Sequence, residues 1–134
     1  MKFDKELLDA LTEEAKRSPR LRMNRDMRTS PADSSQRMLN ALEPGTVVSV
    51  HRHPHSTETV CVLRGAVRQS FFEEVAGERS LKLVDRYTIE AGSPCPIYVV
   101  PAGMWHTTES LVSGTIIFEA KDGKYGEDGS EGWG

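Results

Sequence analysis

The chain has 134 residues, of which 37% are hydrophobic and 28% are charged, and its formal net charge at pH 7 is -3. These values are typical of a globular protein of one domain, and the slight negative charge argues against general nucleic-acid binding. No apolar run approaches the roughly 20 residues of a membrane span, and acidic residues spread through the N-terminus argue against a secretory signal. We therefore expect a cytoplasmic protein that binds neither nucleic acid nor membrane.

Residues 4–17 have the pattern of a short amphipathic helix. Asp4 is a candidate N-cap, and one apolar stripe recurs at helical spacing: Leu7, Leu8, Leu11 and Ala15. The helix should end at Ser18, because a residue that precedes a proline is disfavoured in the helical conformation. We expect the stripe to pack against the main body.

The segment 17–37 is the most basic part of the chain and should be extended and partly irregular. It contains six arginines: Arg17, Arg20, Arg22, Arg25, Arg28 and Arg37. Two interpretations remain open. The arginines form a solvated surface strip, or one or two of them reach an anionic ligand, because the guanidinium group matches carboxylate and phosphate geometry.

From Met38 onward the pattern changes to short runs rich in Val, Ile, Phe and Tyr, separated by turn-forming residues. Such runs without intervening helices predict an all-β sandwich or barrel, with its core in residues 36–121. Residues 122–134 are acidic and rich in glycine. We expect a flexible tail there unless Tyr125 or Trp133 attaches it to the body.

Three of the four histidines lie within the five residues 51–55. On a strand, alternate side chains share a face, so His51 and His53 would project together. If the next strand lies antiparallel beside this one, Glu58 reaches the same point. Two imidazoles and a carboxylate are a ligand set for a divalent first-row metal. The alternative is an exposed polar turn that is rich in histidine.

The fourth histidine, His106, follows a turn at 101–103 and begins another strand. In a small barrel the two turn regions can be neighbours, which would bring His106 to the other histidines. Histidine is the commonest metal ligand, so this convergence favours a metal site. We expect Gly45, Gly65 and Gly103 to be turn residues with positive φ.

These residues fit the two sequence motifs of the cupin superfamily. The first motif is matched at every fixed position, by Gly45, His51, His53, Glu58 and Gly65. The second motif resembles the run that contains Pro101, Gly103 and His106. Here Cys95 and Ser110 replace a usual glycine and a usual asparagine. Segments 36–46, 62–65, 71–74, 100–107 and 118–125 further resemble the WbuC family of cupin-fold metalloproteins.

The resemblance implies one cupin domain over residues 1–134: a double-stranded β-helix, or jelly-roll barrel, with a short N-terminal α-helix. It also implies one divalent transition metal, zinc, iron, nickel or manganese, held by His51, His53, Glu58 and His106. His55 has no ligand position in the motif, and we expect it at the rim of the pocket. Members of the WbuC family occur in bacterial surface-polysaccharide (O-antigen) gene clusters.

Three functions are compatible with such a site. The first is a metal-dependent enzyme, similar to an isomerase or epimerase, in which the metal acts as a Lewis acid on a sugar or sugar nucleotide. The second is a non-catalytic cupin that binds a carbohydrate or another small molecule. The third is an iron-dependent dioxygenase. We also expect a homodimer, because pairing through sheet edges covers unpaired strands.

Overall fold

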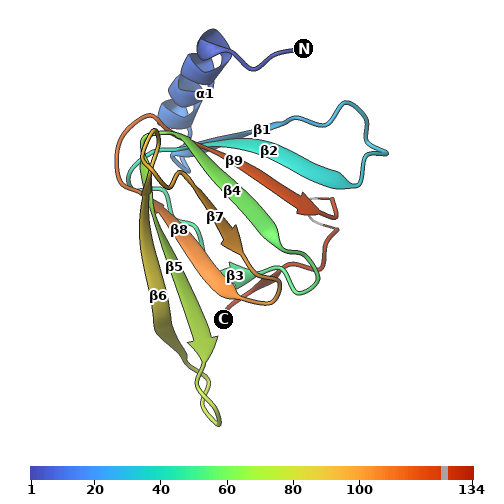
Figure 1. The fold of residues 1–134 in the computed structure, drawn as a ribbon, viewed down its shortest axis with the longest axis vertical. Coiled ribbons are helices and arrows are strands. Elements are labelled where there is room, and N and C mark those ends of the chain that lie inside the picture. Colours follow the sequence, from blue (N-terminus) through green and yellow to red (C-terminus); the bar gives the residue numbers. More distant parts are fainter. Residues whose placement is uncertain (125–126) are drawn as a thin grey trace.

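Two antiparallel sheets of five strands each form the body of the protein (Figure 1). The computed structural model describes residues 1–124 and 127–134. In spatial order, the first sheet contains β1 (Arg22–Asp26), β2 (Ser35–Leu42), β9 (Thr115–Asp122), β4 (Glu58–Arg64) and β7 (Ile97–Val100). The second sheet contains β10 (Glu131–Gly132), β3 (His51–Arg52), β8 (Trp105–Ser110), β5 (Ala66–Glu74) and β6 (Leu81–Glu90).

The expected all-β architecture with one N-terminal helix is confirmed, but the first sheet begins earlier than the sequence pattern indicates. Strand β1 lies within the arginine-rich segment and pairs antiparallel with β2, from Arg22 opposite Leu42 to Asp26 opposite Met38. It is an edge strand, and its last three residues are exposed. An edge strand of this kind needs no alternation of apolar side chains, which is why its sequence does not resemble a buried strand.

The core between the sheets follows the alternation of side chains along each strand. On β4, for example, Val60 and Val62 are buried, whereas their neighbours are exposed or half-buried. The buried cluster consists of Leu42, Val60, Val62, Val67, Phe71, Ile89, Tyr98, Val100 and Ile117. Tyr98 belongs to this core, and its hydroxyl donates to Gln69 Oε1 at 2.9 Å.

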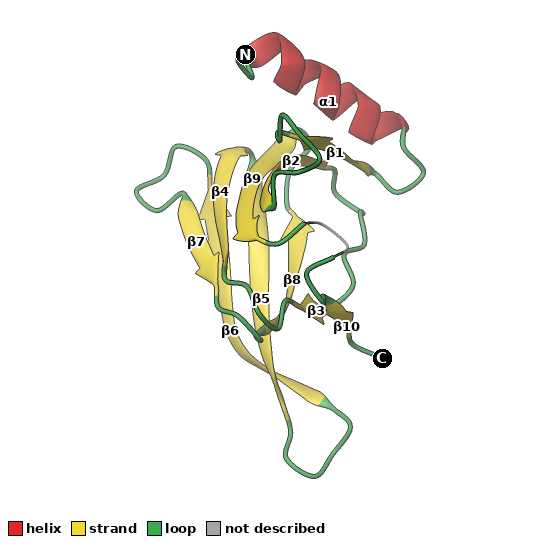
Figure 2. Ribbon diagram, turned by 90° about the vertical axis from the view of Figure 1, so that its right-hand side faces the viewer, coloured by secondary structure: helices red, strands yellow, loops and turns green. Residues whose placement is uncertain are grey.

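Helix α1 (Lys5–Arg17) packs its apolar stripe against the first sheet, where Figure 2 shows it beside β1 and β2. The Asp4 side chain accepts a hydrogen bond from the Leu7 N–H at 3.1 Å and caps the helix as expected. Leu11 and Ala15 form a second buried cluster with residues of β2 and β9. In the part of the chain that is described, no helix has the length and apolar character needed to cross a membrane.

Gly65 carries the chain from β4 in the first sheet to β5 in the second. Its φ is 73°, and a Cβ atom added there would lie 2.8 Å from the Cα of Thr115. Only glycine fits both the left-handed conformation and the close approach of the neighbouring backbone. Gly45 and Gly103 also have positive φ, which confirms the expectation for these turns.

Candidate metal centre

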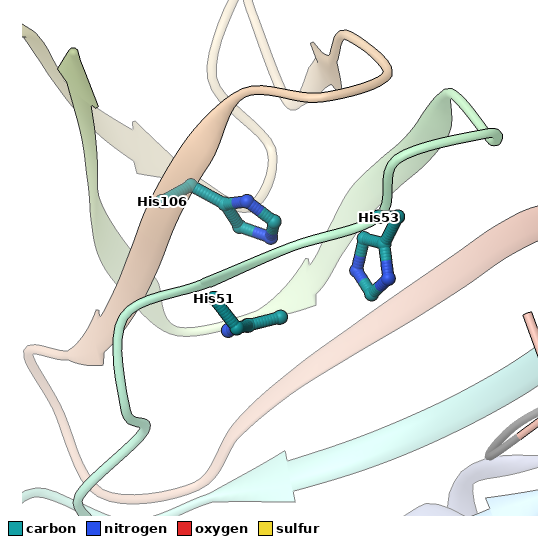
Figure 3. Close-up of side chains that lie close together, drawn as sticks. All are labelled: His51, His53 and His106. Carbon is teal, nitrogen blue, oxygen red and sulfur yellow. The ribbon is translucent and has the colours of Figure 1, made fainter. Parts of the chain in front are cut away.

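Three histidines meet at one end of the second sheet (Figure 3). His51 on β3 and His106 on β8 are direct partners across the two strands, and His53 follows two residues after His51. The ring centroids of His51 and His106 are 4.3 Å apart, and those of His53 lie 5.1 and 5.3 Å from the other two. One ligand atom from each ring falls within 4.8 Å of the others. Such a group can hold a metal ion.

An oxygen atom fixes the Nδ1 side of each ring. His51 Nδ1 lies 2.8 Å from the Ser49 carbonyl oxygen, and His106 Nδ1 lies 2.9 Å from the Met104 carbonyl oxygen. A carbonyl oxygen can only accept, so both Nδ1 atoms carry the proton and donate it. The lone pair of each neutral ring therefore sits on Nε2. A hydrogen bond on the far nitrogen is the usual way in which proteins orient a metal-binding histidine.

Two of the converging Nε2 atoms are buried. In residues 1–124 and 127–134, the Nε2 atoms of His53 and His106 are buried and have no hydrogen-bond partner. An unsatisfied buried acceptor costs about 1–3 kcal/mol, so two beside each other call for an explanation. A metal ion shared by the converging nitrogens satisfies both, and the donor set suits a divalent transition metal.

Burial keeps these two imidazoles neutral. Burial, reinforced by the neighbouring His51, lowers the pKa of His53 to about 4 and that of His106 to about 3. At neutral pH neither ring carries a proton on Nε2, and both lone pairs are available for a metal.

Glu58 reaches the histidines from the opposite sheet. The expected pairing of its strand with the strand of His51 is wrong, because β4 pairs with β7 and β9 and the short β3 pairs with β8 and β10. The Glu58 side chain is buried, and its Oε2 lies 3.4 Å from His53 Nε2. Burial, together with the charge of Glu119, holds the pKa of Glu58 well above its usual range. A cation at the histidines would favour its ionised form.

His55 lies outside the histidine group, and its side chain is exposed. The structure thus brings together His51, His53, His106 and Glu58, and leaves His55 exposed at the surface. Simultaneous binding of one metal by these four residues stays a prediction.

The C-terminal segment supplies the groups that hold His53. His53 Nδ1 lies 2.7 Å from Ser130 Oγ and 3.2 Å from Asp128 Oδ2. Asp128 also accepts hydrogen bonds from Ser130 and from the buried Lys121. Burial alone would raise the pKa of Asp128, but the hydrogen bonds from Lys121 and Ser130 outweigh it and leave this pKa below its ordinary value. Because the Ser130 hydroxyl donates its own proton to Asp128, Ser130 Oγ accepts the Nδ1 proton of His53, and the ionised carboxylate nearby favours the same tautomer.

The sequence leaves two alternatives for residues 122–134, a flexible tail or a segment attached through Tyr125 or Trp133, and the structure shows attachment through Trp133. Residues of β10 pair with β3, and the Trp133 N–H donates to the Val50 carbonyl oxygen at 3.0 Å. The rings of Trp133 and Trp105 pack edge to face with centroids 5.2 Å apart, and Arg52 lies over the Trp105 ring. The high content of glycine concealed these specific contacts. Tyr125, the other candidate for attachment, lies outside the described residues.

A cavity of about 500 Å³ adjoins the histidines and is lined by polar and apolar side chains of β1, β2 and β9. Sequence reasoning missed one of them, Glu119. Burial raises the pKa of Glu119 to about 7, although a hydrogen bond with Asn40 works against this shift. Strand parity is the signal that could have found it, since Ile117, Glu119 and Lys121 are alternate residues of β9 and all line the cavity.

Solved structures of the same fold include oxalate oxidase in complex with glycolate, KdgF from Halomonas sp. and the cupin domain of Schizosaccharomyces pombe Cnp3. The oxalate oxidase has a TM-score of 0.61 and 17% identity, over 87% of this chain and 57% of that chain. KdgF has a TM-score of 0.57 and 16% identity, over 81% of this chain and 84% of the KdgF chain. The Cnp3 domain has a TM-score of 0.57 and 10% identity, over 78% of this chain and 66% of the Cnp3 chain. This chain therefore spans little more than half the length of the oxalate oxidase chain.

These similarities, with two facing antiparallel sheets, define the protein as a cupin-fold protein with a three-histidine group that can hold a metal. No curated protein matches the chain in sequence. Residues 3–82, more than half of the chain, match the family described as Domain of unknown function (DUF6016), and the protein belongs to this family.

Proposed function

We propose that the protein is a metal-dependent cupin enzyme that acts on a small polar molecule such as a sugar or sugar nucleotide. His51, His53, Glu58 and His106 would hold one divalent transition metal. The observation that carries the proposal is the convergence of three imidazole rings, each fixed from behind by an oxygen, beside a cavity. Within the described residues, two of the converging nitrogens are buried without a hydrogen-bond partner.

In the proposed reaction, the metal and a side chain of the cavity would have separate roles. The metal would act as a Lewis acid that polarises a carbonyl or hydroxyl oxygen of the bound molecule. Glu119 lines the same cavity with a pKa raised to about 7. A carboxyl group with this pKa can both accept and return a proton at neutral pH, as an isomerisation or epimerisation requires. His51, His53, Glu58 and His106 would supply four ligand groups, and a metal that accepts more than four would still have room for the bound molecule.

The biological setting rests on the sequence resemblance to the WbuC family, which is the finer assignment that we propose within the cupins. On this assignment the protein would act in bacterial surface-polysaccharide (O-antigen) biosynthesis, with a cytoplasmic sugar or sugar nucleotide as its substrate. The homodimer stays a prediction.

Metal content is the decisive measurement for this proposal. Elemental mass spectrometry of protein purified without a chelator or a polyhistidine tag should find close to one transition metal per chain. The double variant His51→Ala/His106→Ala should lose it, whereas His55→Ala, which removes the exposed histidine, should retain it. Wild-type protein that takes up no metal even after reloading would refute the metalloenzyme.

The class of reaction is tested with Glu119→Gln. This variant should keep its metal and lose turnover of whichever sugar phosphate or sugar nucleotide the wild type converts. Two other outcomes would assign the alternative functions. Bound iron with substrate-dependent oxygen consumption would identify a dioxygenase. Ligand-dependent stabilisation without any product would identify a non-catalytic binding cupin.

A further inference from the structure

Two arginines of the basic segment line the cavity and are available to a ligand. Arg28 is paired with Asp26, and Arg37 is paired with Asp33. Arg20 and Arg22, in contrast, both line the cavity next to the histidines, and in the described part of the chain neither has a carboxylate partner. Two guanidinium groups without protein anions, in a cavity that also holds a candidate metal site, mark a place for an external anion.

The backbone that carries these arginines is fixed. The Arg20 carbonyl oxygen accepts a hydrogen bond from Thr46 Oγ1 at 2.7 Å, and the Leu21 carbonyl oxygen accepts one from the Glu43 N–H at 2.9 Å. Leu21 itself has a φ of 54°, the sole positive φ among the described residues other than glycine. A left-handed leucine is strained, and such strain concentrates at functional sites. The two arginines are thus attached to a backbone that needs little further ordering to bind a ligand.

A neutral group in the same cavity also lacks a partner. Gln36 on β2 lines the cavity and is only 3% exposed, yet within residues 1–124 and 127–134 its Oε1 has no hydrogen-bond partner. An amide oxygen is an acceptor, so its missing partner is a donor such as a hydroxyl group. The cavity therefore presents cations for an anion and an acceptor for a hydroxyl.

We propose that Arg20 and Arg22 bind the phosphate group of a phosphorylated, hydroxyl-rich ligand, while Gln36 accepts a hydrogen bond from one of its hydroxyls. This deepens the proposed function and rests on it for the identification of the cavity as a ligand site. A phosphate monoester carries about −1.5 to −2 charges at pH 7. Two guanidinium groups together neutralise the charge of the phosphate group, and each can donate two hydrogen bonds to its oxygen atoms. A carboxylate carries a single negative charge and would neutralise only one of the two guanidinium groups.

The test compares four probes with metal-loaded protein in a phosphate-free buffer: inorganic phosphate, glucose 6-phosphate, glucose and glucuronate. Calorimetric titration should detect inorganic phosphate, and glucose 6-phosphate should bind more tightly than either glucose or glucuronate. The double variant Arg20→Gln/Arg22→Gln should weaken glucose 6-phosphate at least tenfold. Arg25→Gln is the matched control, because Arg25 lies on the same strand, is exposed and does not line the cavity.

Several outcomes would overturn the assignment. Equal binding of glucose and glucose 6-phosphate would exclude a phosphate site, and glucuronate that binds as well as glucose 6-phosphate would exclude the preference for phosphate. If the metal binds the phosphate group directly, the arginine double variant should bind phosphate with the same affinity as the wild type. That outcome would also refute the proposal. The metal content of every sample is measured, so that the proposed metal centre and the proposed phosphate site are tested separately. Both arginine variants should retain the wild-type metal content, so a failure of the metal centre appears there and not in the arginine comparison.

Discussion

His51 and His106 face each other directly across β3 and β8, with ring centroids 4.3 Å apart, although they are far apart in the sequence. Strand β3 has only two residues, and it is held on its other side by β10. The geometry of the histidine group therefore depends on a short pairing that the C-terminal segment supports.

Asp128→Asn should weaken metal binding. The ionised carboxylate lies 3.2 Å from His53 Nδ1 and accepts the hydroxyl proton of Ser130, whose oxygen accepts the Nδ1 proton of His53. The neutral amide would no longer impose that tautomer with the same strength. Loss of such an outer partner costs about 10–100-fold in metal affinity. Competition with a chelator of known affinity measures the change.

Two further variants separate this effect from a loss of stability, since Asp128→Asn also leaves the buried Lys121 without its ionised partner. Ser130→Ala keeps the pair of Asp128 and Lys121 and should reduce metal affinity less than Asp128→Asn does. Asp122→Asn, at an exposed neighbour, should leave the affinity unchanged. A folded Asp128→Asn protein with wild-type metal affinity would contradict the prediction.

Glu119→Gln should alter the pH dependence of stability in metal-stripped protein. Glu119 titrates near 4.5 in the unfolded chain and near 7 in the folded protein. Its stabilising contribution is fully present below pH 4.5 and is lost as the pH rises through about 7, because the folded state holds the proton longer. Glutamine imitates the protonated side chain and should avoid this loss.

Urea unfolding of both proteins at pH 5, 6, 7 and 8 measures the effect. The advantage of Glu119→Gln over wild type should grow with pH, by up to about 3 kcal/mol. Glu109→Gln, at an exposed position in the second sheet, serves as the control and should show no such trend. A constant difference between Glu119→Gln and wild type would mean that the Glu119 carboxyl is not shifted in the folded protein.

Gly65→Ala should destabilise the protein more than Gly77→Ala does. Both glycines have a φ near 75°, so both substitutions carry the cost of a left-handed alanine. Only at Gly65 would the new Cβ meet neighbouring backbone, 2.8 Å from the Cα of Thr115, whereas nothing lies within 4 Å of it at Gly77. The additional loss in free energy of unfolding should be roughly 1–3 kcal/mol. Equal losses for the two variants would show that the close approach at Gly65 relaxes freely.

The sequence predicts the fold and the histidines of the site well, because both depend on local patterns: short apolar runs for the strands and fixed spacings for the histidines. Spacing within the two motifs singles out His51, His53 and His106, which the structure brings together. The partner of each strand is not a local property, and for that reason the sequence does not reveal that Glu58 reaches the histidines from the opposite sheet.

The parts that escaped prediction depend on contacts between distant segments. Glycine and acidic residues after position 121 suggest disorder. In the structure, however, Asp128 and Ser130 contact His53, and the Trp133 ring packs against Trp105. Arg22 lies in a strand without an apolar pattern, because that strand is at the edge of its sheet. Composition describes each segment by itself and cannot reveal such partners.

The attachment of the C-terminal segment to His53 has a consequence for the order of events during translation. His51, His53, Glu58 and His106 all leave the ribosome before Asp128 and Ser130, whose side chains hold the His53 ring. A nascent chain that has exposed every candidate ligand still lacks the groups that orient one of them. The candidate ligands are therefore synthesised before the groups that orient His53, and cleavage before Asp128 should give a protein that retains all four candidate ligands and loads metal poorly.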